Sequence, residues 1–338
     1  MDDLTCIPTT WRNAPALLII GATHEVVLSL RGGHLAALRL RGETLNPLWQ
    51  PPWPGADPAT VVPGSSAPYG DGAEAFLLAG IVGSNLCCDR FGAPWPGERR
   101  PLHGEAGVAT YQRTTIAASA ASPTAEVAIE AYLPEAGLWV ARGISLDGAS
   151  CLLRTTVRHQ GQHDRAIEWC EHTNLGDPFL DGCAISADVD AAYNLPGRPE
   201  PAFAHYPPLG AIPLAVALPV PKADAPATGA FAAGRVQGAG LATWSAVNRR
   251  LRRRLTATFS AAAFPWLGLW TQHRSRQTPP WSGITRVRGM ELSTKPFPEG
   301  KPPALRARHF QGRSTQCLVP PGRGLEKTIR FTWERLTG

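Results

Sequence analysis

The sequence lacks the features that identify several large classes of protein. None of its apolar runs approaches the ~20 residues that a membrane-spanning helix needs. No GxGxxG, GxxxxGK(S/T) or GxSxG motif is present, so dinucleotide-binding, P-loop and hydrolase-elbow functions have no support. Charged residues make up only 18% of the 338 residues and hydrophobic ones 43%. This balance excludes an intrinsically disordered chain.

Signals for metal binding and secretion are also missing. The seven cysteines are an odd number without the spacing of metal ligands, so we expect reduced thiols and no metal site. The first residues are acidic and then polar, unlike a secretory signal. Together these features predict a cytoplasmic protein.

The net charge of +6 is modest, and part of it is concentrated in the arginine run between residues 249 and 254. We interpret this run as a solvated strand face, with a polyanion-binding patch as the alternative. No nucleic-acid-binding motif accompanies it. We therefore predict neither a nucleic-acid partner nor a membrane partner.

Glycine and proline are abundant, with 34 and 33 residues, and between them the hydrophobic pattern has a period of two. For example, Val127, Ile129, Ala131 and Leu133 occupy one face of a single segment. Such alternation predicts half-buried strands, and no long window shows helical spacing. We predict an all-β fold, a large antiparallel β-sandwich. Its strands are expected over residues 16–20, 24–30, 34–40, 108–116, 125–133, 138–146, 151–159, 166–170, 241–247, 253–260 and 328–334.

Three stretches rich in proline, glycine and small residues are predicted to be long loops, over residues 46–72, 91–101 and 194–239. Loops of this length in a compact domain usually form functional rims or insertions. Strand-like sequence of the same character lies on both sides of the third loop. We therefore predict a single domain over residues 1–338.

Three short polar stretches interrupt otherwise strand-like sequence, and each holds a candidate catalytic side chain. His103 lies within residues 101–107, His172 within residues 171–176 and Glu291 within residues 288–292. Taken singly, each residue has a purely structural explanation. A histidine beside apolar residues is more often part of the core or the surface, and a glutamate near an arginine more often forms an ion pair.

Taken in order, these stretches resemble the motifs of the galactose mutarotase-like, or aldose 1-epimerase-like, superfamily. The resemblance extends from residue 32 to residue 333. It depends on the order and spacing of short motifs. These are GHLAAL at 33–38, GIVGSN at 80–85, LHGEA at 102–106, EHTNL at 171–175 and MELSTKPFP at 290–298.

The resemblance implies a β-sandwich that binds a sugar in a cleft and interconverts its α and β anomers through the open-chain aldehyde. This reaction needs a base for the C1 hydroxyl proton and an acid for the ring oxygen. By resemblance, Glu291 would be the base, His172 the acid, and His103 would hold the substrate and stabilise charge at the ring oxygen. Asn174, which follows His172 closely, would contact the substrate. No metal or organic cofactor is implied.

Two positions depart from the family pattern. The arginine expected after the glycine-rich segment has no clear match, and of Asn85 and Arg90 we choose Arg90 as the candidate. The sugar-binding aspartate expected between His172 and Glu291 has no recognisable motif either. Asp188 and Asp190 are the nearest candidates.

The segment before Glu291 is rich in aromatic and basic residues. Trp270 and Trp281 are predicted to stack on the sugar. Arg274, with the neighbouring Arg276, Arg286 and Arg288, suggests an acidic or phosphorylated sugar, since arginine forks bind carboxylate and phosphate. The other interpretation is that these arginines pair with nearby carboxylates or water.

Two other functions are compatible with the sequence. A non-catalytic sugar-binding protein on the same fold would keep the tryptophans and histidines while Glu291 binds a hydroxyl. A glycan lyase or hydrolase is the second alternative, and a hydrolase would need two carboxylates across the scissile bond. Glu105 or Glu171 could form such a pair with Glu291. Which sugar is bound, and whether the protein is a monomer or a homodimer, are left open.

Overall fold

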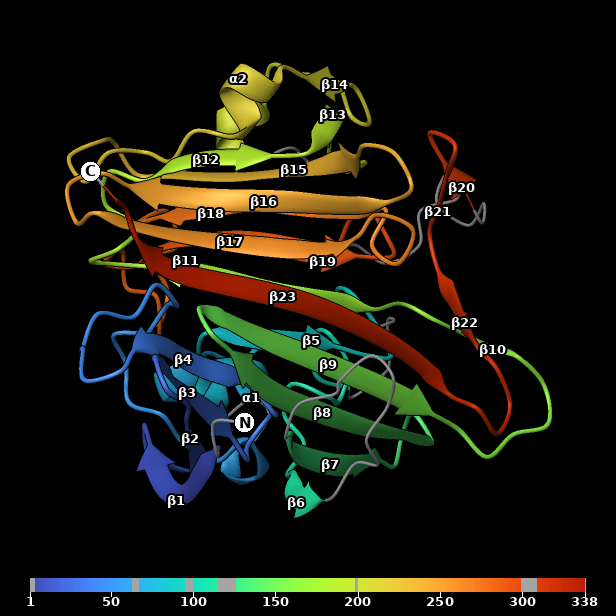
Figure 1. Ribbon diagram of the computed structural model, residues 1–338. Coiled ribbons are helices and arrows are strands. Elements are labelled where there is room, and N and C mark those ends of the chain that lie inside the picture. Colours follow the sequence, from blue (N-terminus) through green and yellow to red (C-terminus); the bar gives the residue numbers. More distant parts are fainter. Residues whose placement is uncertain are drawn as a thin grey trace.

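Two large antiparallel sheets make up most of the molecule. The computed structural model describes residues 4–62, 67–94, 100–114, 126–197, 200–298 and 309–337. In Figure 1 the eight-stranded sheet lies in front of the eleven-stranded sheet. The predicted all-β sandwich is therefore confirmed. No helix in these ranges is long and apolar enough to cross a membrane.

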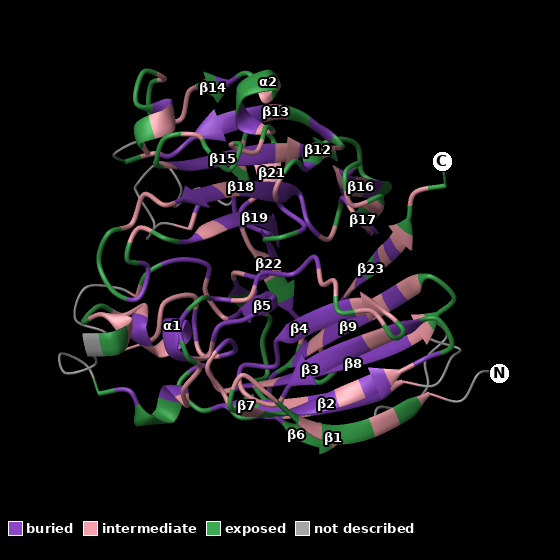
Figure 2. Cartoon of the chain, turned by 90° about the vertical axis from the view of Figure 1, so that its left-hand side faces the viewer, coloured by how far each residue is buried: buried purple, intermediate pink, exposed green. Residues whose placement is uncertain are grey.

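The larger sheet holds eleven strands. Their spatial order is β1 (Thr5–Trp11), β2 (Ala14–Ile20), β3 (His24–Ser29), β4 (Leu35–Leu40), β5 (Ser84–Cys87), β11 (Cys170–Gly176), β19 (Arg286–Ser293), β18 (Trp266–His273), β15 (Thr228–Val236), β13 (Val189–Asn194) and β14 (Ala211–Ile212). Strands far apart in the sequence therefore meet at its centre. Figure 2 shows the edge strand β1 largely exposed and the central strands buried.

The smaller sheet holds eight strands. Their order is β12 (Ala184–Ala187), β16 (Leu241–Asn248), β17 (Arg253–Ser260), β23 (Leu325–Arg335), β9 (Ser150–Arg158), β8 (Leu138–Asp147), β7 (Val127–Leu133) and β6 (Gln112–Thr114). Two short pairs complete the strands, β10 (Arg165–Ile167) with β22 (Cys317–Val319) and β20 (His309–Phe310) with β21 (Arg313–Ser314). The helices are short: α1 (Ala75–Gly80), α2 (Leu214–Ala217) and 3-10 turns at Pro58–Thr60, Ala67–Tyr69 and Pro201–Phe203.

Alternating side chains bury one face of each sheet against the other. In β23, Ile329, Phe331 and Trp333 are buried, and the residues between them are intermediate or exposed. These side chains join one hydrophobic cluster that includes Leu267 and Leu292 of the larger sheet. The period-two pattern thus predicts both the strands and the faces that meet in the core. The arginine run lies at the β16–β17 turn and the start of β17, where Arg250, Arg253 and Arg254 form ion pairs with acidic side chains.

Two predictions about individual segments are wrong. Residues 194–239 were expected to form one loop, yet β15 occupies Thr228–Val236 in the middle of the larger sheet. Its small residues, in the sequence TGAFAAGRV, have low strand propensity. Small residues are needed at such positions because neighbouring strands leave little room for side chains. A Cβ at Gly234 would lie 3.0 Å from a side-chain carbon of Val189.

The second wrong prediction concerns the segment around His172. Its polar residues were expected to follow a strand over residues 166–170, but β10 ends at Ile167 and β11 carries the polar residues itself, from Cys170 to Gly176. Both faces of β11 are buried. Its sequence therefore lacks the alternation of apolar and polar residues that predicts a strand. This placement puts His172 inside the larger sheet.

The register at the centre of the larger sheet positions the candidate site. His172 in β11 is the direct partner of Asn85 in β5 and of Glu291 in β19, and Glu291 is the partner of Gly268 in β18. Directly opposed residues share a face of the sheet. Because Leu292 belongs to the core between the sheets, Glu291 faces the other way. The row of polar side chains therefore lies on the outward face of the larger sheet.

Candidate functional site

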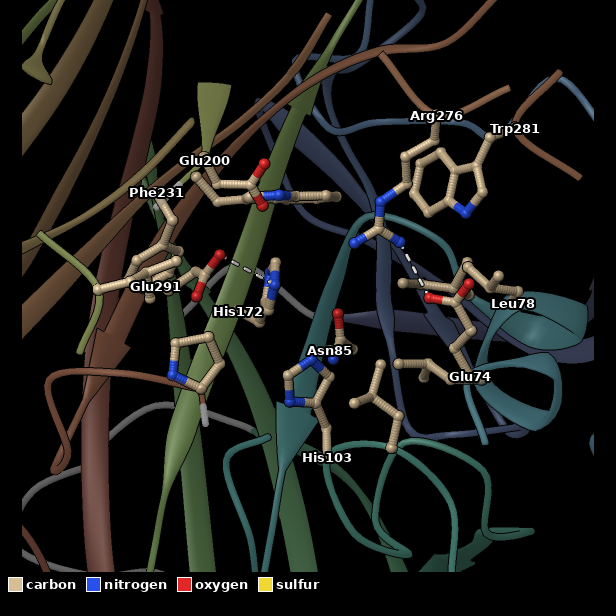
Figure 3. A pocket seen from close by; sticks show the side chains of 16 residues that line it. Glu74, Leu78, Asn85, His103, His172, Glu200, Phe231, Arg276, Trp281 and Glu291 are labelled. Carbon is tan, nitrogen blue, oxygen red and sulfur yellow. Dashed lines mark hydrogen bonds and ion pairs between the residues drawn. The ribbon is translucent and has the colours of Figure 1, made fainter. Parts of the chain in front are cut away.

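A cavity of about 230 Å³ opens over this outward face. Asn85, His172, Glu291, Trp270 and Phe231 enter it from the strands β5, β11, β19, β18 and β15. Connecting segments supply the other walls, including His103, Glu200, Arg276, Trp281 and α1 with the preceding Glu74. Figure 3 shows these side chains converging on one space. A pocket of this kind, largely apolar with a few convergent polar groups, is typical of a small-molecule site.

Glu291 is held by two glycines. A Cβ at Gly268 would lie 2.8 Å from its Oε2, and a Cβ at Gly289 would lie 2.7 Å from its Oε1. Both positions therefore have to remain free of side chains for the carboxyl group to occupy its place. The Glu291 residue is only 2% exposed. Burial raises its pKa to about 8, against the opposing effect of the Arg288 guanidinium.

His172 contacts Glu291 directly. Its Nε2 lies 3.1 Å from Oε1 of Glu291, and its ring meets Trp270 edge-on at a centroid distance of 5.8 Å. Burial lowers the pKa of His172 to about 4, although hydrogen bonding, including that to Asn174, favours the charged ring. Burial therefore opposes charge on both members of the pair, the carboxylate and the imidazolium.

His103 has a defined tautomer. Its Nδ1 accepts a hydrogen bond from the backbone N–H of Gly92 at 3.0 Å, so the proton of the neutral ring is on Nε2. Burial holds the pKa of His103 well below its usual range, and His172 nearby adds to this effect. The ring is also stacked on Phe91 at 5.6 Å. His103 can therefore offer the cavity an N–H donor.

The His103–Gly104 sequence forms a tight turn. Both residues have positive φ angles, of 66° and 79°, a region that glycine adopts readily and that other residues adopt at a cost. A Cβ at Gly104 would lie 2.5 Å from the carbonyl oxygen of Cys88. The glycine that follows this histidine is therefore required by close backbone contact.

An ion pair and Trp281 form the wall away from Glu291, and Trp270 contacts both Trp281 and His172. Arg276 donates to Glu74 at 2.9 Å, and its guanidinium lies 4.9 Å from the ring of Trp281 and 5.8 Å from that of Trp270. Trp270 and Trp281 themselves meet edge-to-face at 6.0 Å. The hydrogen bond to Glu74 and the contacts with the two tryptophan rings together fix the orientation of the Arg276 guanidinium.

Comparison with known proteins identifies the fold. No protein-family model and no curated protein sequence matches the chain. A candidate aldose 1-epimerase from Klebsiella pneumoniae matches with a TM-score of 0.66 and 17% identity, over 98% of this chain and 84% of that chain. A galactose mutarotase-like protein from Clostridium acetobutylicum matches with 0.65 and 10%, over 99% of both chains. A galactose mutarotase-related enzyme from Lactobacillus acidophilus matches with 0.60 and 11%, over 95% of this chain and 98% of that chain.

The chain has the galactose mutarotase-like fold. This agrees with the superfamily that the sequence motifs resemble. At such low identity the likeness concerns the fold, and a fold hosts more than one function. The activity of this chain depends on its own side chains.

Five of the predicted site residues line the cavity of the mutarotase-like fold. They are His103, His172, Trp270, Trp281 and Glu291. The register explains why residues so distant in sequence meet, since β5, β11, β19 and β18 are adjacent strands.

Three other predicted residues do not line the cavity. Arg90 is absent from its walls, and Asn85, the option not chosen, is present. Asn174 is buried and donates to the carbonyl oxygen of Gly83 at 3.0 Å. Arg274 follows β18 and contacts the carbonyl oxygen of Ala225. Their positions do not support direct substrate contact, although a hydrogen bond involving Asn174 favours the charged form of His172.

The carboxylate partners considered for a hydrolase are also placed elsewhere. Glu171 is on the opposite face of β11, where it pairs with the buried Arg142 at 3.1 Å. Glu105 accepts hydrogen bonds from the backbone N–H groups of Glu135 and Ala136. Neither residue lines the cavity, so neither forms a pair with Glu291 across it.

The cavity also contains polar residues that the sequence did not reveal. The additional carboxylates of the cavity are Glu74 and Glu200. The two aspartates considered as sugar ligands from the sequence do not line it: Asp188 accepts a hydrogen bond from Thr243, and Asp190 pairs with Arg235. Glu200 lies in the proline-rich segment after β13, and no local pattern marks it. No group of three or more potential metal ligands occurs in the described ranges of the chain.

Proposed function

We propose that the protein is an aldose 1-epimerase that interconverts the α and β anomers of a free sugar, with Glu291 and His172 as its acid–base pair. The observation that carries this proposal is the 3.1 Å contact between these two buried groups at the wall of the cavity. The reaction requires one proton acceptor and one proton donor within reach of the same hemiacetal. The pair supplies both.

Ring opening removes the proton from the C1 hydroxyl and adds a proton to the ring oxygen. The bond from C1 to the ring oxygen breaks, and the C1 carbonyl forms. Rotation about the C1–C2 bond presents the other face of the aldehyde, and the same two proton transfers in reverse close the ring. Each group thus ends the cycle in the protonation state in which it began.

The pKa values suit this exchange. With the pKa of Glu291 near 8 and that of His172 near 4, the pair holds one proton over the intervening pH range. That proton can be on Glu291, which then acts as the acid, or on His172, which leaves Glu291 as the base. Either arrangement contains one acid and one base.

Other side chains can orient the sugar. The Nε2–H of His103 can donate to the ring oxygen as negative charge develops there. Glu200 can accept hydrogen bonds from the hydroxyl groups of the sugar. This is the role that the resemblance gives to an aspartate for which the sequence has no recognisable motif. The ring faces of Trp270 and Phe231 can cover the apolar face of a pyranose.

A neutral sugar fits the charges of the cavity better than the acidic or phosphorylated sugar expected from the arginine-rich segment. Arg288 is bound to Thr271 and to the carbonyl oxygen of Ala217, and Arg286 is paired with Asp177. Among the described lining residues, Arg276 is the only cation, and it is paired with Glu74.

We also propose that the reaction takes place in the cytoplasm, on a single domain. The seven cysteines are free thiols, as is usual in a reducing compartment. The continuous hydrophobic cluster between the two sheets supports one domain.

The proposal is tested by mutarotation of freshly dissolved α-anomers, followed by polarimetry or by NMR of the anomeric protons. Glu291→Gln should slow the catalysed rate by about 10²- to 10⁴-fold while sugar affinity is retained. Glu334→Gln, in β23 and outside the cavity, is the matched control and should have no effect.

Three results would count against the proposal. Acceleration that persists in Glu291→Gln would remove this residue from catalysis. Loss of both affinity and turnover would make Glu291 chiefly a ligand. Binding without acceleration for every sugar would leave a non-catalytic sugar-binding protein.

A further inference from the structure

The peptide group between Phe91 and Gly92 lies between His103 and a buried ion pair. Its N–H end, on Gly92, donates to Nδ1 of His103 at 3.0 Å. Its C=O end, on Phe91, accepts a hydrogen bond from Nζ of Lys295 at 3.2 Å. A trans peptide group is planar, and its N–H and C=O point in opposite directions. The contact with Lys295 at one end therefore fixes the direction in which the other end points.

Lys295 is itself held by Glu168. Its Nζ lies 3.0 Å from Oε2 of Glu168, and the same oxygen accepts a hydrogen bond from the backbone N–H of Phe91 at 3.1 Å. The two side chains are only 4% and 12% exposed, so water competes little for these contacts. The ion pair therefore holds Phe91 at both its N–H and its C=O.

This ion pair also connects the loop of His103 to the strands of the proposed acid–base pair. Lys295 follows β19, the strand of Glu291, and Glu168 precedes β11, the strand of His172. β11 and β19 are neighbours in the larger sheet. His103 reaches the cavity from a connecting segment (Figure 3), and the ion pair places that segment relative to the two strands.

Gly92 gives this peptide group the freedom to flip. Its φ angle of 127° is one that glycine adopts readily and other residues rarely adopt. A flipped peptide group would present the C=O of Phe91 to His103 in place of the N–H of Gly92. Nδ1 of the neutral ring would then carry the proton, and Nε2 would be an acceptor. The hydrogen bond from Lys295 opposes this flip because it holds the Phe91 oxygen on the side away from His103.

We propose that Lys295 and Glu168 are positioning residues for His103: through the Phe91–Gly92 peptide group they keep the proton of its neutral ring on Nε2, so that the ring presents a hydrogen-bond donor to the cavity. The inference rests on the proposed function for the use of that donor, which is to stabilise charge at the ring oxygen of the sugar. Burial is the main cause of the low pKa of His103, and the charges of His172 and Lys295 act in the same direction. The ring is therefore neutral, and the position of its single proton decides whether it donates or accepts.

The experiment measures the tautomer of His103 and the rate in the same variants. Lys295→Met removes the ammonium and keeps an unbranched side chain of similar size. Long-range proton–nitrogen NMR of the histidine rings, assigned with His103→Ala, reports which nitrogen carries the proton. We expect the Nε2–H tautomer alone in the wild type and a clear Nδ1–H population in Lys295→Met. Mutarotation of α-glucose and α-galactose should show kcat lowered by about 10- to 100-fold and KM changed by less than about threefold, because the lost donor acts in the transition state.

Glu168→Gln is the second, milder variant. It keeps an oxygen acceptor for the backbone N–H of Phe91 but removes the charge that holds Lys295, so it should produce a smaller change in the same direction. Arg154→Met and Glu126→Gln are the matched controls. They break an ion pair of 2.6 Å between side chains that are 4% and 9% exposed, and neither residue lines the cavity. The controls should lose stability without any change in the His103 tautomer or in kcat. Thermal melting shows which variants are folded.

The outcomes separate this inference from the proposed function, because the NMR measurement does not depend on turnover. An unchanged tautomer in the folded variants of Lys295 and Glu168 would overturn the inference, even if kcat fell, since the ion pair would then act only on stability. A tautomer change in the controls as well would also overturn it. A tautomer change confined to Lys295→Met and Glu168→Gln, in a protein that does not accelerate mutarotation, would support the inference and overturn the function.

Discussion

The burial of Glu291 has a measurable consequence for stability. Its pKa is raised from the ordinary value of 4.5 to about 8. A raised carboxyl pKa means that the folded state binds a proton that the unfolded state has released. The resulting stabilisation is complete below pH 4.5 and is lost as the pH rises toward 8. At about 1.4 kcal/mol per pH unit, the loss approaches 5 kcal/mol by pH 8 and is about 3 kcal/mol at pH 7.

Glu291→Gln removes this titration without removing the side chain's volume. The free energy of unfolding of the variant, minus that of the wild type, should therefore increase by up to about 3 kcal/mol between pH 4.5 and pH 7. Urea unfolding at fixed pH values measures the difference. Glu334→Gln, a half-buried control outside the cavity, should show no comparable increase. A flat difference for Glu291→Gln as well would refute the buried, protonated carboxyl.

The remaining predictions concern the rate and the framework of the site. The pH profile of kcat/KM should be bell-shaped. It should fall below about pH 4, where His172 and Glu291 are both protonated, and above about pH 8, where neither is. A profile that is flat to pH 10 would contradict the proposed acid–base pair. Gly268→Ala should lower kcat by about a hundredfold, because its Cβ would displace the Glu291 carboxyl; an unchanged kcat would show that this position is uncritical. Arg142→Met should destabilise the fold by about 3–5 kcal/mol, since it leaves the buried Glu171 carboxyl without its guanidinium partner. The double variant with Glu171→Met should recover most of that loss in urea unfolding, and an additive effect would argue against the pairing.

Local periodicity allowed much of the framework to be predicted from the sequence. In strands such as β16 and β17, buried side chains alternate with intermediate or exposed ones. This alternation is visible in the sequence because it follows from the geometry of a single strand. β15 and β11 are buried on both faces and have no such alternation. Their small or polar residues therefore suggested a loop in one case and a strand end in the other.

The candidate site divides in a similar way. The order of short motifs singled out His103, His172 and Glu291, and the structure places all three at one cavity. Glu200 has no motif around it, and it reaches the cavity only because the segment after β13 passes over β15. The sequence also could not distinguish Arg276, which lines the cavity, from the neighbouring Arg274, which does not.

By itself, the sequence determined the all-β class, most of the half-buried strands and the identity of three central polar side chains. These depend on residues that are close together in the chain. The pairing of His172 with Glu291, the orientation of Glu171 toward the core and the neutralisation of Arg276 by Glu74 were decided by the tertiary structure. They depend on sheet register and burial, which arise from contacts between segments far apart in the sequence. Burial also shifts the pKa values of Glu291 and His172, and so it creates the chemistry that we propose for this site.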